Sequence, residues 1–395
     1  MQAPRGPGLT VSTAPSAFVP PALGSASSLA PPSATGSVPP SPNPSLSRSR
    51  SSARASGLSR VLKPLAAFLD ASSDPRAKFT DLAEIAQGES GSVFSARLVG
   101  SASDWRIPAT PNSPLARDKE NEWGKEGRMV ALKIIPAVGN ATKLASLKRE
   151  LELVRGVRHP NVLAFDGVFV DTDAEALWLA MELMERSLAD VLSLSSPDMG
   201  LDPAERGKVI LSERLRARCV WDALLALSYL KKQRIAHRDL RSDNLLVSPE
   251  GVVKLADFGV AVRAPPGAPR SSERVGVVYW QAPEMRTGLY DPLKVDVWSL
   301  GATAWEFAVG EPPFSDGGAP PSGYSLPPLP QDSEASRAFE DFLHLCAQPP
   351  SSRPEPDELL NAHFVRMAAP RSALVALLNR CKIVEDRLLG RSDEG

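Results

Sequence analysis

His237-Arg238-Asp239-Leu240-Arg241-Ser242-Asp243-Asn244 is a polar string that separates a helical pattern from a short apolar run at residues 245–247. A second apolar run, residues 252–255, follows after a turn, and the two runs predict a β-hairpin. A polar loop between a helix and a hairpin seldom has this composition by chance. Within the loop, Asp239 can accept a proton from a hydroxyl group, and Asn244 can bind a metal ion.

A second short motif, Asp257-Phe258-Gly259, comes directly after the hairpin. Alone, this triplet carries no information. Its position, 13 residues after Asn244 and behind a hairpin, gives it meaning. In that position the Asp257 carboxylate can bridge a divalent cation to phosphate oxygens.

A glycine-containing loop lies upstream, at Ala86-Gln87-Gly88-Glu89-Ser90-Gly91-Ser92-Val93, between two runs with strand-like alternation. Small residues let backbone N–H groups approach phosphate oxygens closely. Taken by itself, such a loop is most often only a turn.

Lys133 ends the apolar run Val130-Ala131-Leu132, and an interior strand rarely carries an unpartnered lysine. The alternative is an edge-strand lysine that points into water. A helix is expected near residues 143–158, and Glu150 lies at the rim of its apolar stripe. A Lys133–Glu150 pair would hold the ammonium group on phosphates. Glu152 is a competing partner on the far side from the stripe.

The order of elements predicts the α+β class. Strands with one key helix come first and form a small β-rich N-lobe, and a larger, mostly α-helical C-lobe follows. We expect a disordered Pro/Ser/Ala-rich tail, two lobes and a C-terminal helical tail, at residues 1–76, 77–184, 185–366 and 367–395. Two inserts, at 99–128 and 193–209, are expected to be loops.

These motifs, in this order, resemble the signature of the eukaryotic protein kinases over about residues 77–366. The resemblance implies the bilobal protein-kinase fold, ATP and Mg²⁺ as cofactors, and phosphorylation of protein substrates in intracellular signalling. The ending Ser242-Asp243-Asn244 and the run at 73–79 are similar to the sterile-twenty-like group and its PAK kinases. Their GTPase-binding segment is not seen in residues 1–76.

The resemblance also assigns roles to individual residues. It implies a catalytic set of Asp239, Lys133, Glu150 and Arg241. It implies metal ligands at Asn244 and Asp257, with Glu284 and Arg353 as a buried ion pair. It implies that the nucleotide is bound by Ala86, Gly88, Ser90, Gly91, Val93, Ala131, Lys133, Met181, Glu182, Met184 and Leu246.

Three positions depart from the family pattern. Ala86 replaces the first glycine of the loop. Arg241 replaces a lysine, and Val277 replaces a threonine whose hydroxyl normally contacts the catalytic aspartate. Trp280 and the overall resemblance favour serine/threonine specificity, with tyrosine or dual specificity as the alternative. A weak pseudokinase or scaffold is a second alternative, although the catalytic lysine and both aspartates are retained.

A regulatory interpretation concerns Glu273 in the run Arg270-Ser271-Ser272-Glu273-Arg274. It occupies the position where relatives carry an activating phosphothreonine. A carboxylate there can pair with Arg238 and support partial activity without phosphorylation. The alternative is that Glu273 is one more solvated charge, with Ser271 and Ser272 as modification sites.

Composition limits the remaining choices. Lys and Arg number 45 against 46 Asp and Glu, so the chain lacks the basic excess of a nucleic-acid-binding protein. No apolar run approaches the length of a membrane span. Three scattered cysteines indicate a reducing, cytoplasmic location, with an organelle as the alternative because the N-terminus is poor in acidic residues. Motifs such as PPSP at 39–42 suggest partners with Pro-binding domains.

The last stretch, residues 372–389, has apolar residues at helical spacing. We expect an amphipathic helix that packs back on the large lobe. The alternative is a helix that binds a partner protein.

Overall fold

A computed structural model describes residues 58, 60–70, 74–88, 91–99, 128–137, 141–163, 165–196, 207, 210–315, 323–331 and 335–392. The predictions made for residues 1–57, for Ser90 and for most of the two inserts lie outside these residues.

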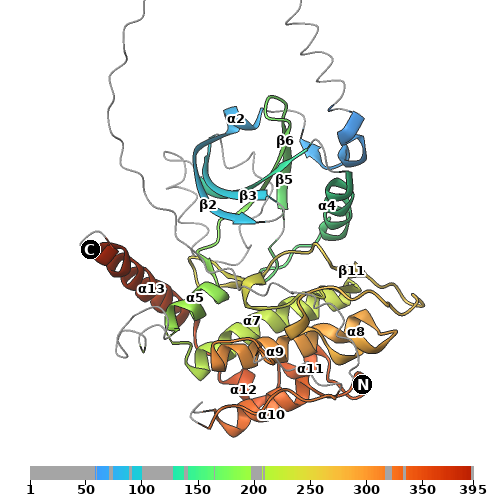
Figure 1. Cartoon of the computed structure of the whole chain (residues 1–395), viewed down its shortest axis with the longest axis vertical. Coiled ribbons are helices and arrows are strands. Elements are labelled where there is room, and N and C mark those ends of the chain that lie inside the picture. The colour runs from blue at the N-terminus through green and yellow to red at the C-terminus, as the bar shows by residue number, and fades with distance from the viewer. Residues whose placement is uncertain are drawn as a thin grey trace, which may run out of the picture. The chain divides into compact units, whose positions relative to one another are not determined.

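The described chain folds into a β-sheet layer with one long helix, followed by a mostly helical layer (Figure 1). The first layer contains η1 (Lys63–Leu65), β1 (Leu69–Asp70), α2 (Pro75–Lys78), β2 (Phe79–Gly88), β3 (Gly91–Leu98), β4 (Arg128–Pro136), α4 (Ala141–Val154), β5 (Phe165–Asp171) and β6 (Ala176–Glu182). The second begins with β7 (Arg186–Ser187), α5 (Leu188–Ser195), α7 (Glu213–Lys232), β8 (Ile235–Ala236), η4 (Ser242–Asn244), β9 (Leu245–Val247), β10 (Val253–Leu255) and β11 (Val262–Arg263). It ends with η5 (Val278–Trp280), α8 (Pro283–Thr287), η6 (Pro292–Lys294), α9 (Val295–Val309), α10 (Arg337–Cys346), α11 (Pro356–Leu359), α12 (His363–Arg366) and α13 (Arg371–Ser392).

The large sheet has the strand order β1-β5-β6-β4-β3-β2, so β4 is an interior strand. Lys133 lies on β4 opposite Val93 of β3 and Leu179 of β6. Because directly paired residues share a face, Lys133 lies on the same face as Leu179. Leu179 is part of the apolar cluster that α4 covers. The edge-strand alternative for Lys133 is therefore wrong.

The opposite face of the sheet is closed by aromatic side chains. The ring of Phe79 meets the ring of Phe169 edge to face at 5.2 Å and lies 6.3 Å from the ring of Trp178. These rings belong to a separate apolar cluster with Val130 and Leu132. A polar ligand of the sheet is thereby confined to the face that carries Lys133.

Helix α4 has the apolar stripe that the sequence predicted. Leu144, Leu147 and Leu151 are buried against the sheet. The helix ends at Val154, four residues before the predicted end. Gly156 adopts a left-handed φ of +80°, which stops the helix there.

The core of the helical layer is α9, which is buried from Val295 to Phe307. A helix that is buried on all sides belongs in the centre of a large domain. It packs against α7 and α10. The predicted hairpin forms as β9 and β10, and β7 joins it as a third strand. The buried Arg353 donates to the Glu284 carboxylate at 2.7 Å, which is the ion pair that the resemblance implied.

One segment corrects the sequence interpretation, which assigned residues 1–76 to a disordered tail. Leu58, Leu62 and Leu65 are buried in the same apolar cluster as the stripe of α4. Strand β1 then pairs in parallel with β5, Leu69 opposite Val168. These leucines have helical spacing, so their shared apolar side outweighs the polar composition of the tail before them.

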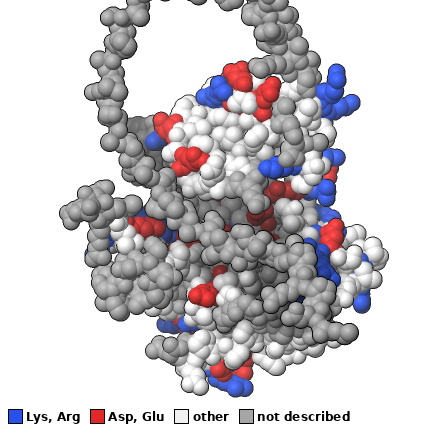
Figure 2. All heavy atoms as spheres, viewed as in Figure 1, with Lys and Arg blue, Asp and Glu red and all other residues white. Residues whose placement is uncertain are grey.

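Charges of both signs are interspersed over the visible described surface (Figure 2). Within the described ranges, no helix combines the length and the apolar character needed to cross a bilayer.

Leu65→Ala in the full-length chain is expected to lower the free energy of unfolding by about 2–5 kcal/mol, because the leucine is fully buried beneath α4. Val61→Ala is the control, since Val61 is 40% exposed and its truncation should change stability by only about 0.5 kcal/mol. Denaturant unfolding measures both. Equal effects of the two variants would show that residues 58–70 do not pack on the domain.

Candidate functional site

The loop of residues 237–244, called the catalytic loop below, is fixed by a buried carboxylate. Asp296, near the start of α9, accepts the backbone N–H groups of His237 and Arg238 at 2.8 and 2.7 Å. Burial raises the pKa of Asp296, and these hydrogen bonds oppose the rise. Arg238 has a left-handed φ of +68°, so the loop turns sharply just before Asp239.

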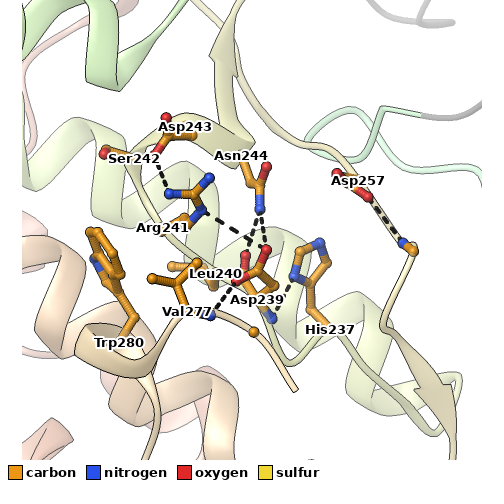
Figure 3. Close-up of polar contacts among 12 residues, drawn as sticks. His237, Asp239, Leu240, Arg241, Ser242, Asp243, Asn244, Asp257, Val277 and Trp280 are labelled. Carbon is orange, nitrogen blue, oxygen red and sulfur yellow. Dashed lines mark hydrogen bonds and ion pairs between the residues drawn. The ribbon is translucent and has the colours of Figure 1, made fainter. Parts of the chain in front are cut away.

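The Asp239 carboxylate is held by donors from two directions (Figure 3). The amide nitrogen of Asn244 donates to Oδ2 at 3.1 Å and to the backbone oxygen of Asp239 at 2.7 Å. The backbone N–H of Val277 donates to Oδ1 at 3.2 Å. A carboxylate fixed in this way is positioned to accept a proton from a substrate hydroxyl.

The backbone N–H of Val277 therefore binds Asp239, although Val277 lacks the hydroxyl group that the family's threonine would offer. The close approach depends on Gly276, which has a left-handed φ of +78°. A Cβ on Gly276 would collide with the backbone oxygen of Arg238 and lie 3.1 Å from Asp239 Oδ1. The sequence reasoning missed this contact, since it considered only side-chain groups.

Arg241 brings a cation beside the same carboxylate (Figure 3). Its Nε lies 3.9 Å from Asp239 Oδ2, and its Nη1 lies 2.8 Å from Asp243 Oδ2. The guanidinium also lies over the ring of Trp280, 5.6 Å from the centroid. These contacts fix the positive charge next to the predicted proton acceptor.

Glu306 is a further site residue that the sequence reasoning missed. It lies on α9, where it accepts hydrogen bonds from the hydroxyl of Ser242 and, at 3.0 Å, from the indole nitrogen of Trp280. Burial raises the pKa of Glu306 to about 7. A glutamate inside the apolar pattern of α9 was the available signal, because a buried carboxylate requires partners. Glu306 joins the catalytic loop to the segment that carries Val277.

Asn244 and Asp257 present oxygen atoms beside the catalytic loop (Figure 3). Asn244 uses its amide nitrogen on Asp239, which leaves the amide oxygen directed away from that carboxylate. Asp257 has a left-handed φ of +62°, and its Oδ1 accepts the N–H of Gly259 at 3.0 Å. Carboxylate and amide oxygens are the ligands that hard divalent cations prefer, so this donor set fits such an ion.

Glu150, rather than Glu152, faces Lys133. Glu150 is half-buried, and its carboxylate accepts the backbone N–H of Phe258 and interacts electrostatically with Lys133. Burial raises its pKa to about 7, and Lys133 opposes that rise. Glu152 is half exposed and pairs with Lys148 at 3.4 Å.

The residues predicted to bind a nucleotide come from both layers. Ala131 pairs with Met181 across β4 and β6, on the same face as Lys133 and Val93. Leu246 lies on β9 of the helical layer, next to Ser187. Between them runs the connection from Glu182 to Met184, and Glu182 pairs with Lys254 of β10.

The glycine loop is described only at its base. Gly88 pairs with Gly91, and Ala86 pairs with Val93. Gly91 has a φ of +147°, and a Cβ there would collide with the backbone oxygen of Ile134. A glycine is thus required at Gly91. Ala86 lies directly after an irregularity in the β2–β3 register, between Glu84 and Ala86.

The activation segment, residues 257–284, is tied to the catalytic loop by Glu273. Arg238 is nearly buried, and its Nη1 donates to Glu273 Oε2 at 2.8 Å. The hydroxyl of Tyr290 donates to the Glu273 backbone oxygen at 2.7 Å. Ser271 accepts the N–H of Glu273 on its hydroxyl, and Ser272 is exposed. Glu273 is therefore a partner of Arg238 rather than only a solvated charge.

Comparisons with known proteins agree with this geometry. The family model for the protein kinase domain matches residues 122–365. The chain is 32% identical over 318 residues to serine/threonine-protein kinase TAO1-A of Xenopus laevis, covering 78% of this chain and 28% of the relative. It is 31% identical over 317 residues to serine/threonine-protein kinase PAK 1 of Mus musculus, covering 78% and 50%.

A third relative, serine/threonine-protein kinase pakC of Dictyostelium discoideum, is 30% identical over 320 residues, covering 79% of this chain and 58% of the relative. The chain thus spans less than two thirds of the length of each of these relatives.

Glu273→Gln is expected to lower kcat of phosphoryl transfer by about threefold to tenfold, or roughly 0.7–1.4 kcal/mol, because Arg238 loses its charged partner. Ser272→Ala is the control and should retain activity, because Ser272 is exposed. Steady-state kinetics on protein purified after phosphatase treatment provides the measurement. Activity that disappears on dephosphorylation while Glu273→Gln matches the wild type would contradict the pairing.

Proposed function

Because this chain belongs to the protein kinase domain family, we propose that it transfers the γ-phosphoryl group of ATP to serine and threonine hydroxyls of protein substrates. The Asp239 carboxylate carries the proposal. It is held by Asn244 and Val277 within a loop that Asp296 anchors. Phosphoryl transfer requires positioning and charge stabilisation, and this arrangement supplies the positioning.

In the proposed reaction, the substrate oxygen attacks the γ-phosphorus. The bond from that phosphorus to the bridging oxygen of ADP breaks, and the hydroxyl proton passes to Asp239. Arg241 adds positive charge beside the site, 3.9 Å from the Asp239 carboxylate. Lys133, oriented by Glu150, and the backbone of Gly88 and Gly91 are proposed to bind the phosphates.

We propose Mg²⁺ as the divalent ion, bound by Asn244 and Asp257. Their oxygen donors support this proposal. When bound, the ion neutralises charge on the phosphates. The link from the Asn244 backbone oxygen to the N–H of Ala256, at 2.9 Å, fixes the spacing between the two ligand-bearing segments.

The adenine is proposed to lie between Val93 and Ala131 on one side and Leu246 on the other. Met181, which pairs with Ala131, would limit the depth of the site. The backbone of the connection from Glu182 to Met184 would bind the edge of the base. The Glu182–Lys254 ion pair supports this proposal because it fixes the connection to the second layer.

The pseudokinase alternative is not favoured. Asp239 keeps its hydrogen-bond partners, Glu150 faces Lys133, and Asp257 stays beside the catalytic loop. The names of the relatives support serine/threonine rather than tyrosine specificity.

Several broader proposals complete the function. We propose residues 77–366 as the kinase domain, signalling proteins as substrates, and Pro-binding domains as partners of the N-terminal region. A cytoplasmic location is proposed because Cys219, Cys346 and Cys381 are free, buried thiols.

Asp239→Asn in the full-length chain is expected to lower kcat by about 10²–10⁴-fold without weakening ATP binding, because the amide cannot accept the proton. Asp341→Asn, on the exposed side of α10, is the matched control. The measurement is transfer of labelled phosphate from Mg-ATP to an acceptor protein, followed by phosphoamino-acid analysis. Label on tyrosine, or equal transfer by wild type and Asp239→Asn, would refute the proposal.

A further inference from the structure

Helix α13 packs on the helical layer through one apolar stripe. Leu374, Leu377, Leu378, Cys381 and Val384 are buried in the same core as α5 and α7. This is the amphipathic helix that the sequence predicted (Figure 1). The stripe alone would hold the helix to the domain.

Two ion pairs also connect α13 to Glu185 and Arg186, which directly follow residues 182–184. The guanidinium of Arg186 donates through both terminal nitrogens to the Glu385 carboxylate, at 2.7 and 2.8 Å. The Nζ of Lys382 lies 2.7 Å from Oε1 of Glu185. The Arg186 side chain is only 8% exposed, so its fork has little water to compete with Glu385.

The segment that α13 binds directly follows residues 182–184 of the proposed adenine site. The N–H of Glu185, which directly follows Met184, donates to the backbone oxygen of Val247 at 2.8 Å. In β7, Arg186 pairs with Val247 and Ser187 pairs with Leu246. A displacement of Arg186 would therefore be transmitted to both the connecting segment and the strand that carries Leu246.

The N-terminal end of α13 contacts the turn between β9 and β10 of the same small sheet. Gly251, in the turn between β9 and β10, has a φ of +74°, and a Cβ there would lie 3.1 Å from Val375. Arg371 lies 3.9 Å from the buried Asp222, which also accepts the N–H of Val253 at 3.1 Å. The helix thus contacts the sheet of β7, β9 and β10 at two separate places.

We propose that α13 forms part of the nucleotide site, with Glu385 as a positioning residue that acts through Arg186 on residues 182–184 and on Leu246. The inference rests on the proposed function, since it concerns how the same site binds ATP. It also gives the C-terminal helix a role within the domain, where the sequence left partner binding open. The face of α13 that carries Lys382 and Glu385 is occupied by Glu185 and Arg186 of the same domain.

The test compares Glu385→Gln with the wild type in the full-length chain. Glu385→Gln keeps the shape of the side chain and removes the charge. We expect the dissociation constant of a fluorescent ATP analogue and the KM for ATP to rise about fivefold, the lower end of typical coupling between linked sites. At saturating ATP, kcat and the KM for the acceptor protein should stay at wild-type values. Asp386→Asn, exposed on the next position of the helix, is the matched control and should bind ATP normally.

A second variant tests the route through Arg186. Arg186→Gln should weaken ATP binding as much as Glu385→Gln, and the double variant should be no weaker than either single one. ATP binding by Glu385→Gln at wild-type strength would overturn the inference. A fall in kcat together with a lower melting temperature would also overturn it, because the helix would then act only on stability. A wild-type chain that binds no ATP would instead refute the proposed function itself.

Discussion

The buried Asp296 carboxylate is the constraint on which the site depends. It accepts two consecutive backbone N–H groups of the catalytic loop, from His237 and Arg238. Without this carboxylate, the two N–H groups would be buried and unpaired. The left-handed backbone conformation of Arg238 would also lose the hydrogen bond that stabilises it. The carboxylate is itself costly to bury, so the loop and the α9 carboxylate stabilise each other.

The loop that Asp296 holds in place contacts the other parts of the site. Its Asp239 and Asn244 form one hydrogen-bonded unit, and its Arg238 side chain binds Glu273 of the activation segment. Ser242 of the loop and Trp280 of the activation segment both donate hydrogen bonds to the carboxylate of Glu306 on α9. The helix α9 is therefore more than the centre of the core. Its two carboxylates, Asp296 and Glu306, set the position of the catalytic loop relative to the segment that carries Val277 and Trp280.

The parts of the fold that follow from local patterns were predictable. The stripe of α4, the β9–β10 hairpin and the burial of α13 all depend on periodic apolar residues close in sequence. The proposed roles of Lys133, Asp239 and Asp257 came from the resemblance to the kinase signature and not from a local apolar pattern. Contacts made by backbone groups were not predictable, because the N–H of Val277 reaches Asp239 only through the left-handed turn at Gly276. The packing of residues 58–70 was missed because composition was averaged over the whole N-terminal stretch, which hid three leucines with helical spacing.

The most direct measurement is the rate of phosphoryl transfer by Asp296→Asn, alongside its affinity for ATP. The asparagine side chain keeps one oxygen acceptor but turns its NH₂ group toward one of the two backbone N–H groups that Asp296 binds. The catalytic loop therefore loses a hydrogen bond to a charged group. We predict a fall in kcat of about tenfold to a hundredfold, matching roughly 1.5–3 kcal/mol for such a bond, with ATP affinity retained. Transfer at the wild-type rate by a variant that still binds ATP would contradict the account, because the loop would then hold Asp239 in place without its anchor.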